Sequence, residues 1–118
     1  HARMCSIFRQ QEEMGIEPKP FEEADLNLLT DEHEIKLMRH LCLYPLMIEK
    51  AALAMEPHRL AFYASELASI FHSWYNAQRF LLEDDLPLTY ARLALVKASQ
   101  NVLQDVLRVM GVDAPESM

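Results

Sequence analysis

"LAFYASELASIFHSWYNAQRFL", residues 60–81, is the stretch that decides the fold. Its apolar residues recur at steps of three and four, which is the spacing that places side chains on one face of an α-helix. The residues that share this spacing are Leu60, Ala64, Leu67, Phe71, Trp74, Gln78 and Leu81. An apolar stripe of this length has to be buried against neighbouring elements, so the stretch predicts a long helix inside a helical assembly.

The segments before this stretch also have helical spacing. A helix is predicted over residues 1–14, with Gly15 as its stop, because glycine readily adopts the left-handed conformation that ends helices. A proline-containing connection follows, with a helical turn over residues 21–28. Thr30 is the predicted N-cap of the next helix. The apolar residues that recur along that helix are Ile35, Met38, Leu41 and Cys42.

Prolines and a second glycine mark the remaining boundaries. Pro45 is predicted to interrupt one helix and to precede a second short one, and Pro57 suits the first position of the long helix. Pro87 lies near the start of the last helix, which Gly111 ends. The predicted buried face of that helix holds Leu93, Val96, Leu103, Val106, Leu107 and Met110. The prediction is an all-α helix bundle of four to five amphipathic helices, forming a single domain over residues 1–118.

Composition and charge limit the classes of function. The net charge is −7, but residues 12–34 alone carry nine acidic residues against one base, Lys19. The rest of the chain holds nine acids and ten bases, so the acidity is local and leaves room for a positive patch elsewhere. With two glycines in the chain, a glycine-rich phosphate loop is excluded. Cys5 and Cys42 are predicted to be buried free thiols of a cytoplasmic protein.

Residues with catalytic or metal-binding chemistry do not come together in the sequence. His33 and His40 are seven residues apart, about two helical turns, which is too far for a shared metal ion. Asp84 and Asp85 are adjacent in a turn, where a solvated or capping role is expected. We therefore predict no catalytic residue and no metal site in this chain, and no membrane span.

Four blocks carry a resemblance to a known family. They are "HARMCSIFR" (residues 1–9), "EPHRLAFYASELASIFHSWY" (56–75), "ARLALVKASQNVL" (91–103) and "VMGVDAPESM" (109–118). In this order they resemble the C-terminal anticodon-binding domain of arginyl-tRNA synthetase, called the DALR domain. The resemblance covers essentially the whole chain, and the HAR opening and the proline–glutamate–x–methionine ending favour the arginyl type.

The resemblance implies an α-helical bundle of the class I synthetase anticodon-binding type, attached to a catalytic domain outside this chain. That domain would use ATP and Mg²⁺, whereas no cofactor is expected here. Since the chain opens without an initiator methionine, we expect a fragment of a longer cytoplasmic enzyme. The implied partners are the anticodon stem-loop of an arginine tRNA and the parent's own catalytic domain, with no membrane and no DNA.

Two residues are candidates for contact with loop bases. Single-stranded bases are read by stacking on flat side chains and by hydrogen bonds to their edges. Tyr75 lies where the family places an anticodon-facing tyrosine, and core packing beside Trp74 is the alternative. The terminal Met118 would offer an apolar contact to a splayed base. Ser117 departs from the family, which usually has arginine there, so a positive charge near the RNA is missing.

Basic residues complete the predicted RNA-binding set. Arg79, one turn after Tyr75, would contact phosphate or a base, or else serve as an exposed solubilising charge. His1 and Arg3 match the family's histidine–x–arginine, and Arg3 would contact RNA or form a surface salt bridge. Arg9 is a weaker candidate of the same kind. Arg92, in the ARL motif, is predicted to form an internal ion pair in preference to an RNA contact.

A second class of function stays open at this point. The chain could be a helical protein-interaction or dimerisation module whose tail and acidic connection serve a protein partner. The net charge favours this alternative, and the ordered set of motifs favours RNA binding. Binding to RNA that weakens as salt rises would distinguish the two.

Overall fold

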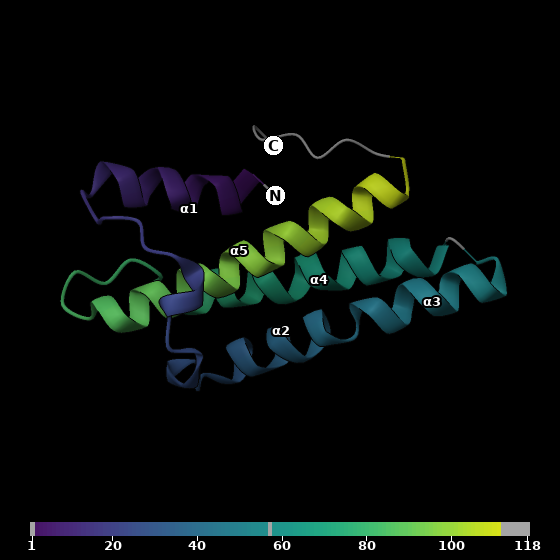
Figure 1. The fold of residues 1–118 in the computed structure, drawn as a ribbon, viewed down its shortest axis with the longest axis horizontal. Helices are drawn as coiled ribbons and strands as arrows, with labels where there is room; N and C mark the ends of the chain where they lie inside the picture. The colour runs from purple at the N-terminus through teal and green to yellow at the C-terminus, as the bar shows by residue number, and fades with distance from the viewer. Residues whose placement is uncertain (1, 57, 112–118) are drawn as a thin grey trace.

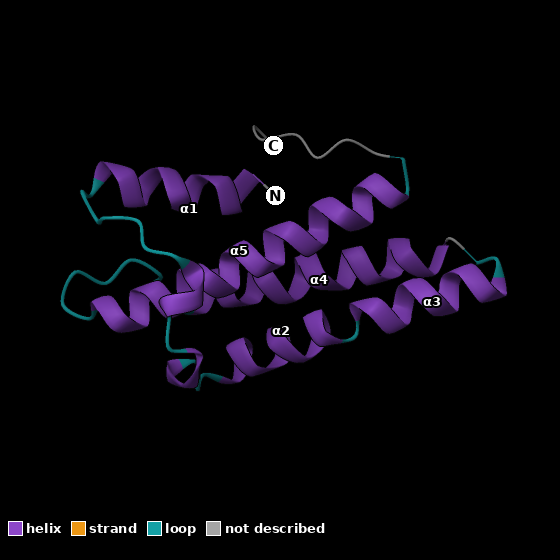
Figure 2. Ribbon diagram, in the orientation of Figure 1, coloured by secondary structure: helices purple, strands orange, loops and turns teal. Residues whose placement is uncertain are grey.

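The fold consists of helices joined by short loops. The computed structural model describes residues 2–56 and 58–111, and this part of the chain forms five α-helices and two 3₁₀ turns without a strand (Figure 2). Their bounds are α1 Ala2–Glu13, η1 Phe21–Glu23, η2 Leu26–Leu28, α2 Glu32–Cys42, α3 Tyr44–Ala54, α4 His58–Ala77 and α5 Leu86–Val109. The predicted all-α bundle is confirmed, and η1 and η2 supply the predicted helical turn.

The two longest helices form the centre of the bundle. α4 and α5 are in contact and run in opposite directions, joined by a loop at one end (Figure 1). α2 and α3 follow one another along one side and contact α4, whereas α1 lies on the opposite side against α5 (Figure 1). The bundle is elongated, measuring 48 × 29 × 25 Å. This arrangement brings the first helix of the chain beside the last two.

The apolar stripe of α4 lies in the core as predicted. Its buried members include Leu60, Ala64, Leu67, Phe71 and Trp74. The helix ends at Ala77, however, so Gln78 and Leu81 follow it instead of extending the stripe. The chain turns there because Phe80 folds back onto Trp74, with 4.2 Å between the ring centroids.

The start and the buried face of α2 differ from the prediction. Asp31, not Thr30, is the N-cap, and it forms a capping box with Glu34. Ile35 and Cys42 are exposed, whereas the residues of α2 that are buried are Glu34, Leu37 and His40. Met38 and Leu41 are partly buried and pack against the core as predicted. Glu34 is paired inside the bundle and His40 is hydrogen-bonded to Tyr63, so α2 buries two polar side chains that the apolar spacing did not indicate.

Glycines and prolines mark most of the predicted boundaries. Gly15 and Gly111 have φ of +73° and +77°, the left-handed conformation that ends α1 and α5. Pro45 lies in the first turn of α3 and Pro87 in that of α5. Pro57 lies outside the described residues. The cysteines are free, but the expectation that both are buried is wrong: Cys5 is half-buried and Cys42 is exposed.

Candidate nucleic-acid interface

The start of α1 is fixed against α5 by packing and by polar contacts. Met4 is buried in the core beneath the helix. Gln100 on α5 donates a hydrogen bond from Nε2 to Sγ of Cys5 over 3.2 Å. The Lys97 ammonium lies 5.9 Å from the centre of the Phe8 ring, within cation–π range. α1 can therefore present its outward side chains at fixed positions relative to α4 and α5.

Arg3 and Tyr75, predicted separately as RNA contacts, touch each other. The guanidinium carbon of Arg3 lies over the Tyr75 ring, 5.1 Å from its centroid. The same guanidinium donates from Nη1 to Nδ1 of His72 over 2.8 Å. Tyr75 is half-buried, since its ring also packs against Phe71 and Phe80 with centroids 6.3 and 5.9 Å away. Tyr75 thus combines core packing with a surface position.

A groove runs from this contact along the end of α4. It encloses about 420 Å³ between α1 and the residues that follow α4. Its lining consists of Ile7, Gln10 and Met14 from α1 and its end, and of Tyr75, Gln78, Arg79, Phe80 and Leu81. Arg3 covers the Tyr75 ring, and Arg79 is an exposed cation on the groove wall. Arg9 does not line the groove, because six residues along a helix place it about 120° around α1 from Arg3.

The backbone on the α4 side of the groove is held by a buried charge. Arg92 on α5 donates from Nε to Oε2 of Glu34 over 2.7 Å, and both side chains are buried. Trp74 donates from Nε1 to the same oxygen over 3.1 Å. Arg92 also donates from Nη1 to the backbone carbonyl of Arg79. The predicted structural role of Arg92 is therefore confirmed, and it fixes the position from which the Arg79 side chain leaves.

Two further contacts hold the loop after α4. Gln78 donates from Nε2 to Oδ1 of Asp31 over 3.0 Å. Burial raises the pKa of Asp31, but hydrogen bonds from His33 and from Gln78 outweigh it, so the pKa lies below its ordinary value. At the other end of the loop the Thr89 hydroxyl accepts from the Leu82 amide (2.8 Å) and donates to the Leu82 carbonyl (3.0 Å). The groove is thus a preformed surface of the bundle.

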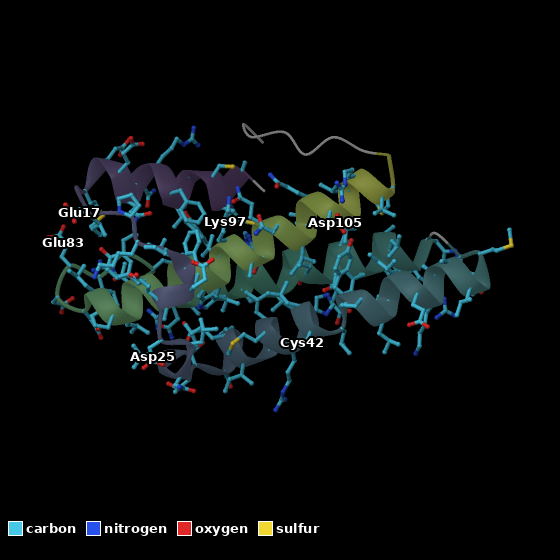
Figure 3. All side chains as sticks on the ribbon, in the orientation of Figure 1. Glu17, Asp25, Cys42, Glu83, Lys97 and Asp105 are labelled. Carbon is cyan, nitrogen blue, oxygen red and sulfur yellow. The ribbon has the colours of Figure 1, made fainter. Side chains whose placement is uncertain are left out.

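Acidic side chains lie near one end of this surface. Glu17 and Glu83 lie at the end of the molecule where the α4–α5 loop turns, and Lys97 lies beside α1 (Figure 3). A neighbouring hollow shares Met14 with the groove and is lined by both of these glutamates. Lys19 also lines this hollow, and the two glutamates would disfavour an anionic ligand there.

His72 is a residue that the sequence reasoning missed. It precedes Tyr75 by one helical turn, and this spacing puts both side chains on one face of α4. Its contact with Arg3, 69 residues away in the chain, depends on how α1 packs and has no signal in the sequence. The predicted contacts His1 and Met118, together with Ser117, lie outside the described residues.

In residues 2–56 and 58–111, no three histidine, cysteine, aspartate or glutamate side chains are grouped as a metal ion would require. None of the helices in this part of the chain is long and apolar enough to cross a bilayer.

The DALR anticodon binding domain family matches residues 1–118. Arginine–tRNA ligase of Halorhodospira halophila is 50% identical over 119 residues, and that of Symbiobacterium thermophilum is 48% identical over 118 residues. The ligase of Carboxydothermus hydrogenoformans is 47% identical over 119 residues. Each of these matches covers 100% of this chain.

The matched relatives are much longer than this chain. The chain spans 20% of the Halorhodospira protein and 21% of each of the other two. No solved structure matches the chain. The resemblance that the four sequence blocks indicated is confirmed by the family match over the full chain.

Proposed function

Because the chain belongs to the DALR anticodon-binding domain family, we propose that it binds the anticodon stem-loop of an arginine tRNA as part of an arginine–tRNA ligase. On this proposal it supplies binding energy and identity discrimination in a cytoplasmic enzyme. Arginine activation with ATP and Mg²⁺ would belong to another part of that enzyme. The catalytic domain would then be the chain's second partner, beside the tRNA.

The observation that carries the proposal is the surrounding of Tyr75. Tyr75 and Arg79 line one groove, and the guanidinium of Arg3 lies over the Tyr75 ring. Aromatic and guanidinium planes stack on unpaired bases, and arginine also neutralises phosphate. An RNA loop presents both unpaired bases and a bent phosphate backbone. The groove therefore offers complementary chemistry on a surface that the Glu34–Arg92 pair holds in place.

Arg79 and the Arg3–Tyr75 pair are proposed to have different roles in binding. The exposed Arg79 would contact phosphate and contribute to affinity regardless of sequence, whereas the Arg3–Tyr75 pair would contact a base. Arg9 would at most contact the stem, since it lies around α1 from the groove. His1 and Met118 remain predicted contacts at the ends of the chain.

Fluorescence anisotropy tests the proposal directly. A labelled arginine-tRNA anticodon stem-loop is titrated with the chain at two salt concentrations, beside a stem-loop of the same stem with a scrambled loop. We expect tighter binding of the native loop and a fall of about one log unit of affinity per log unit of salt for each phosphate neutralised, or somewhat less for single strands. Equal binding of both loops would contradict base recognition. No binding at low salt would favour the protein-interaction module instead.

A further inference from the structure

Resting on the proposed function, we propose that an unpaired base meets the Arg3 guanidinium, laid on the Tyr75 ring, and does not meet the ring itself. His72 is then a positioning residue of the RNA site, because it holds that guanidinium in place. We call the group formed by Arg3 of α1 with His72 and Tyr75 of α4 the Arg3 platform.

The surroundings of the Tyr75 ring support this order of layers. Phe71 and Phe80 pack against the ring from within the bundle, with centroids 6.3 and 5.9 Å away. The guanidinium of Arg3 lies over the ring at 5.1 Å, and Arg3 itself is exposed. On the face of the ring that Arg3 covers, a base approaching from solvent therefore encounters the guanidinium first. A guanidinium is planar and weakly hydrated, so it can stack on the tyrosine below and on a base above at the same time.

The contact with His72 decides how well the platform is preformed. Arginine nitrogens only donate hydrogen bonds, so Nδ1 of His72 has to be the acceptor across the 2.8 Å contact. With one guanidinium nitrogen held by His72, rotation of the long Arg3 side chain is restricted before RNA arrives. The entropy that binding would otherwise lose is then already lost in folding, which favours affinity. The remaining guanidinium donors stay free of His72 and can reach a base edge or phosphate.

The first test needs no RNA. NMR of the Arg3 Nε–Hε and Cδ–Hδ resonances reports whether the guanidinium lies on an aromatic ring, because ring currents shift protons above the ring upfield. We expect the upfield shift in the unaltered chain and its loss in Tyr75→Leu. It should also be lost in His72→Ala, which removes the acceptor, and kept in His72→Asn, whose side-chain oxygen can replace Nδ1. Identical Arg3 shifts in the unaltered chain, His72→Ala and Tyr75→Leu would overturn the platform.

The second test asks whether a base stacks on Arg3. Anticodon stem-loops carrying 2-aminopurine at each loop position in turn report a change of base stacking on binding as a change in fluorescence. We expect Arg3→Lys, which keeps the charge and loses the plane, to abolish this change. The affinity of Arg3→Lys for the stem-loop should fall at least about fivefold, because losing the stacking of one base typically lowers affinity by that factor or more. His72→Ala should weaken binding and reduce the fluorescence change, and His72→Asn should restore both.

The outcomes separate this inference from the function on which it rests. Failure of the unaltered chain to bind any stem-loop would overturn the proposed function, and the inference with it. Binding that is lost only in Tyr75→Leu, with the fluorescence change on binding retained in Arg3→Lys and His72→Ala, would show direct stacking on tyrosine and overturn the inference alone. His72 is exposed, so its variants should fold, and amide spectra that match those of the unaltered chain check this.

Discussion

Arg92 and Glu34, 58 residues apart in the chain, form an ion pair inside the bundle, with 2.7 Å between Nε and Oε2. The pair joins α5 to the first turn of α2, and through Trp74 and the Arg79 carbonyl it reaches the last turn of α4 and the second residue after it. The buried ion pair therefore also fixes the backbone of the groove that is proposed to bind RNA. The fold and the candidate site depend on the same contact.

Removing one partner of this pair should be costly. Arg92→Leu leaves the Glu34 carboxylate buried without its cation, so the free energy of unfolding should fall by about 3–5 kcal/mol. Removing both charges, in Glu34→Leu with Arg92→Leu, should destabilise the chain much less than the sum of the single changes. Urea denaturation of the unaltered chain, of Arg92→Leu, of Glu34→Leu and of the double variant measures the coupling free energy between the two residues.

Arg108 provides the matched control for that cycle. It is paired with Asp105 but its side chain is 79% exposed, so Arg108→Ala should change stability by about 1 kcal/mol at most. If the Glu34 and Arg92 changes proved additive, the two residues would not be energetically coupled.

Arg79→Ala should weaken RNA binding without weakening the fold. Its side chain is exposed, and the contact that Arg92 makes is to its backbone carbonyl, which alanine keeps. Losing one phosphate contact should reduce the slope of log affinity against log salt by about 1. Anisotropy titrations at several salt concentrations measure the slope.

Arg39→Ala is the comparison for Arg79. Arg39 is exposed on α2, and α2 lies across the bundle from α1 (Figure 1). Arg39→Ala removes one positive charge from the chain, as Arg79→Ala does, but leaves the charge of the groove unchanged. Equal losses from the two variants would indicate a general charge effect and contradict a phosphate contact at Arg79.

The fold could be predicted wherever apolar spacing decides the outcome. The α4 stripe from Leu60 to Trp74 is buried as expected, and Gly15 and Gly111 end their helices. On α2 the prediction was right for Met38 and Leu41 and wrong for Ile35 and Cys42. A pattern of apolar residue types does not show that Glu34 is neutralised by a partner far along the chain. Asp31 replaced Thr30 as the N-cap because only Asp31 is followed three residues later by a glutamate that returns the hydrogen bond.

The candidate site could be predicted only in part, for a related reason. Tyr75 lies in the last turn of α4 and Arg79 is the second residue after that helix, so their proximity follows from their closeness in the sequence. The contact of Arg3 with Tyr75 depends on how α1 lies on α5, through Met4 and Gln100. Such packing is a property of the assembled bundle and has no local signal.

Asp31→Ala should lower stability in a pH-dependent way. The carboxylate caps α2 and accepts from Gln78, so its loss should cost about 0.5–2 kcal/mol at pH 7. Because the folded pKa of Asp31 lies below that of the unfolded chain, about 3.9, its contribution is present above that pH and is lost as the pH falls through the folded pKa. The difference between variant and unaltered chain should therefore shrink below about pH 4.

Chemical denaturation at pH 7, 5 and 3 measures this difference. Asp84→Ala, at an exposed position in the α4–α5 loop, serves as the control and should be close to the unaltered chain at each pH. A penalty for Asp31→Ala that stays constant down to pH 3 would contradict a role for the ionised carboxylate.

Glu83→Gln should strengthen RNA binding. Glu83 lines the hollow beside the groove and would repel phosphate there. Removing the charge should raise affinity by a few-fold at low salt, and the gain should fade as salt screens the interaction. Glu49→Gln, exposed on α3, changes the net charge equally at a different place and should have a smaller effect. A gain of equal size from both variants would mean that only the total charge matters.

Tyr63 should make the fold sensitive to alkali. Burial, and then the charges of Cys42 and Glu66, raise its pKa to about 12, above the value of about 10 expected in the unfolded chain. The folded state holds the proton more tightly, so stability is fully present below about pH 10 and falls as the pH rises toward 12. Tyr44 acts in the same direction, because burial and its hydrogen bond to Asp105 raise its pKa.

Tyr63→Phe should flatten this alkaline loss while lowering stability at neutral pH. The hydroxyl donates to the His40 carbonyl over 2.6 Å, and losing that bond should cost about 0.5–1.5 kcal/mol. Guanidinium denaturation at pH 8, 10 and 11 should then show a smaller fall in the variant than in the unaltered chain, with Tyr44 responsible for part of what remains. If stability fell by the same amount in both proteins, folding would not raise the pKa of Tyr63. The alkaline loss of stability would then come from other groups.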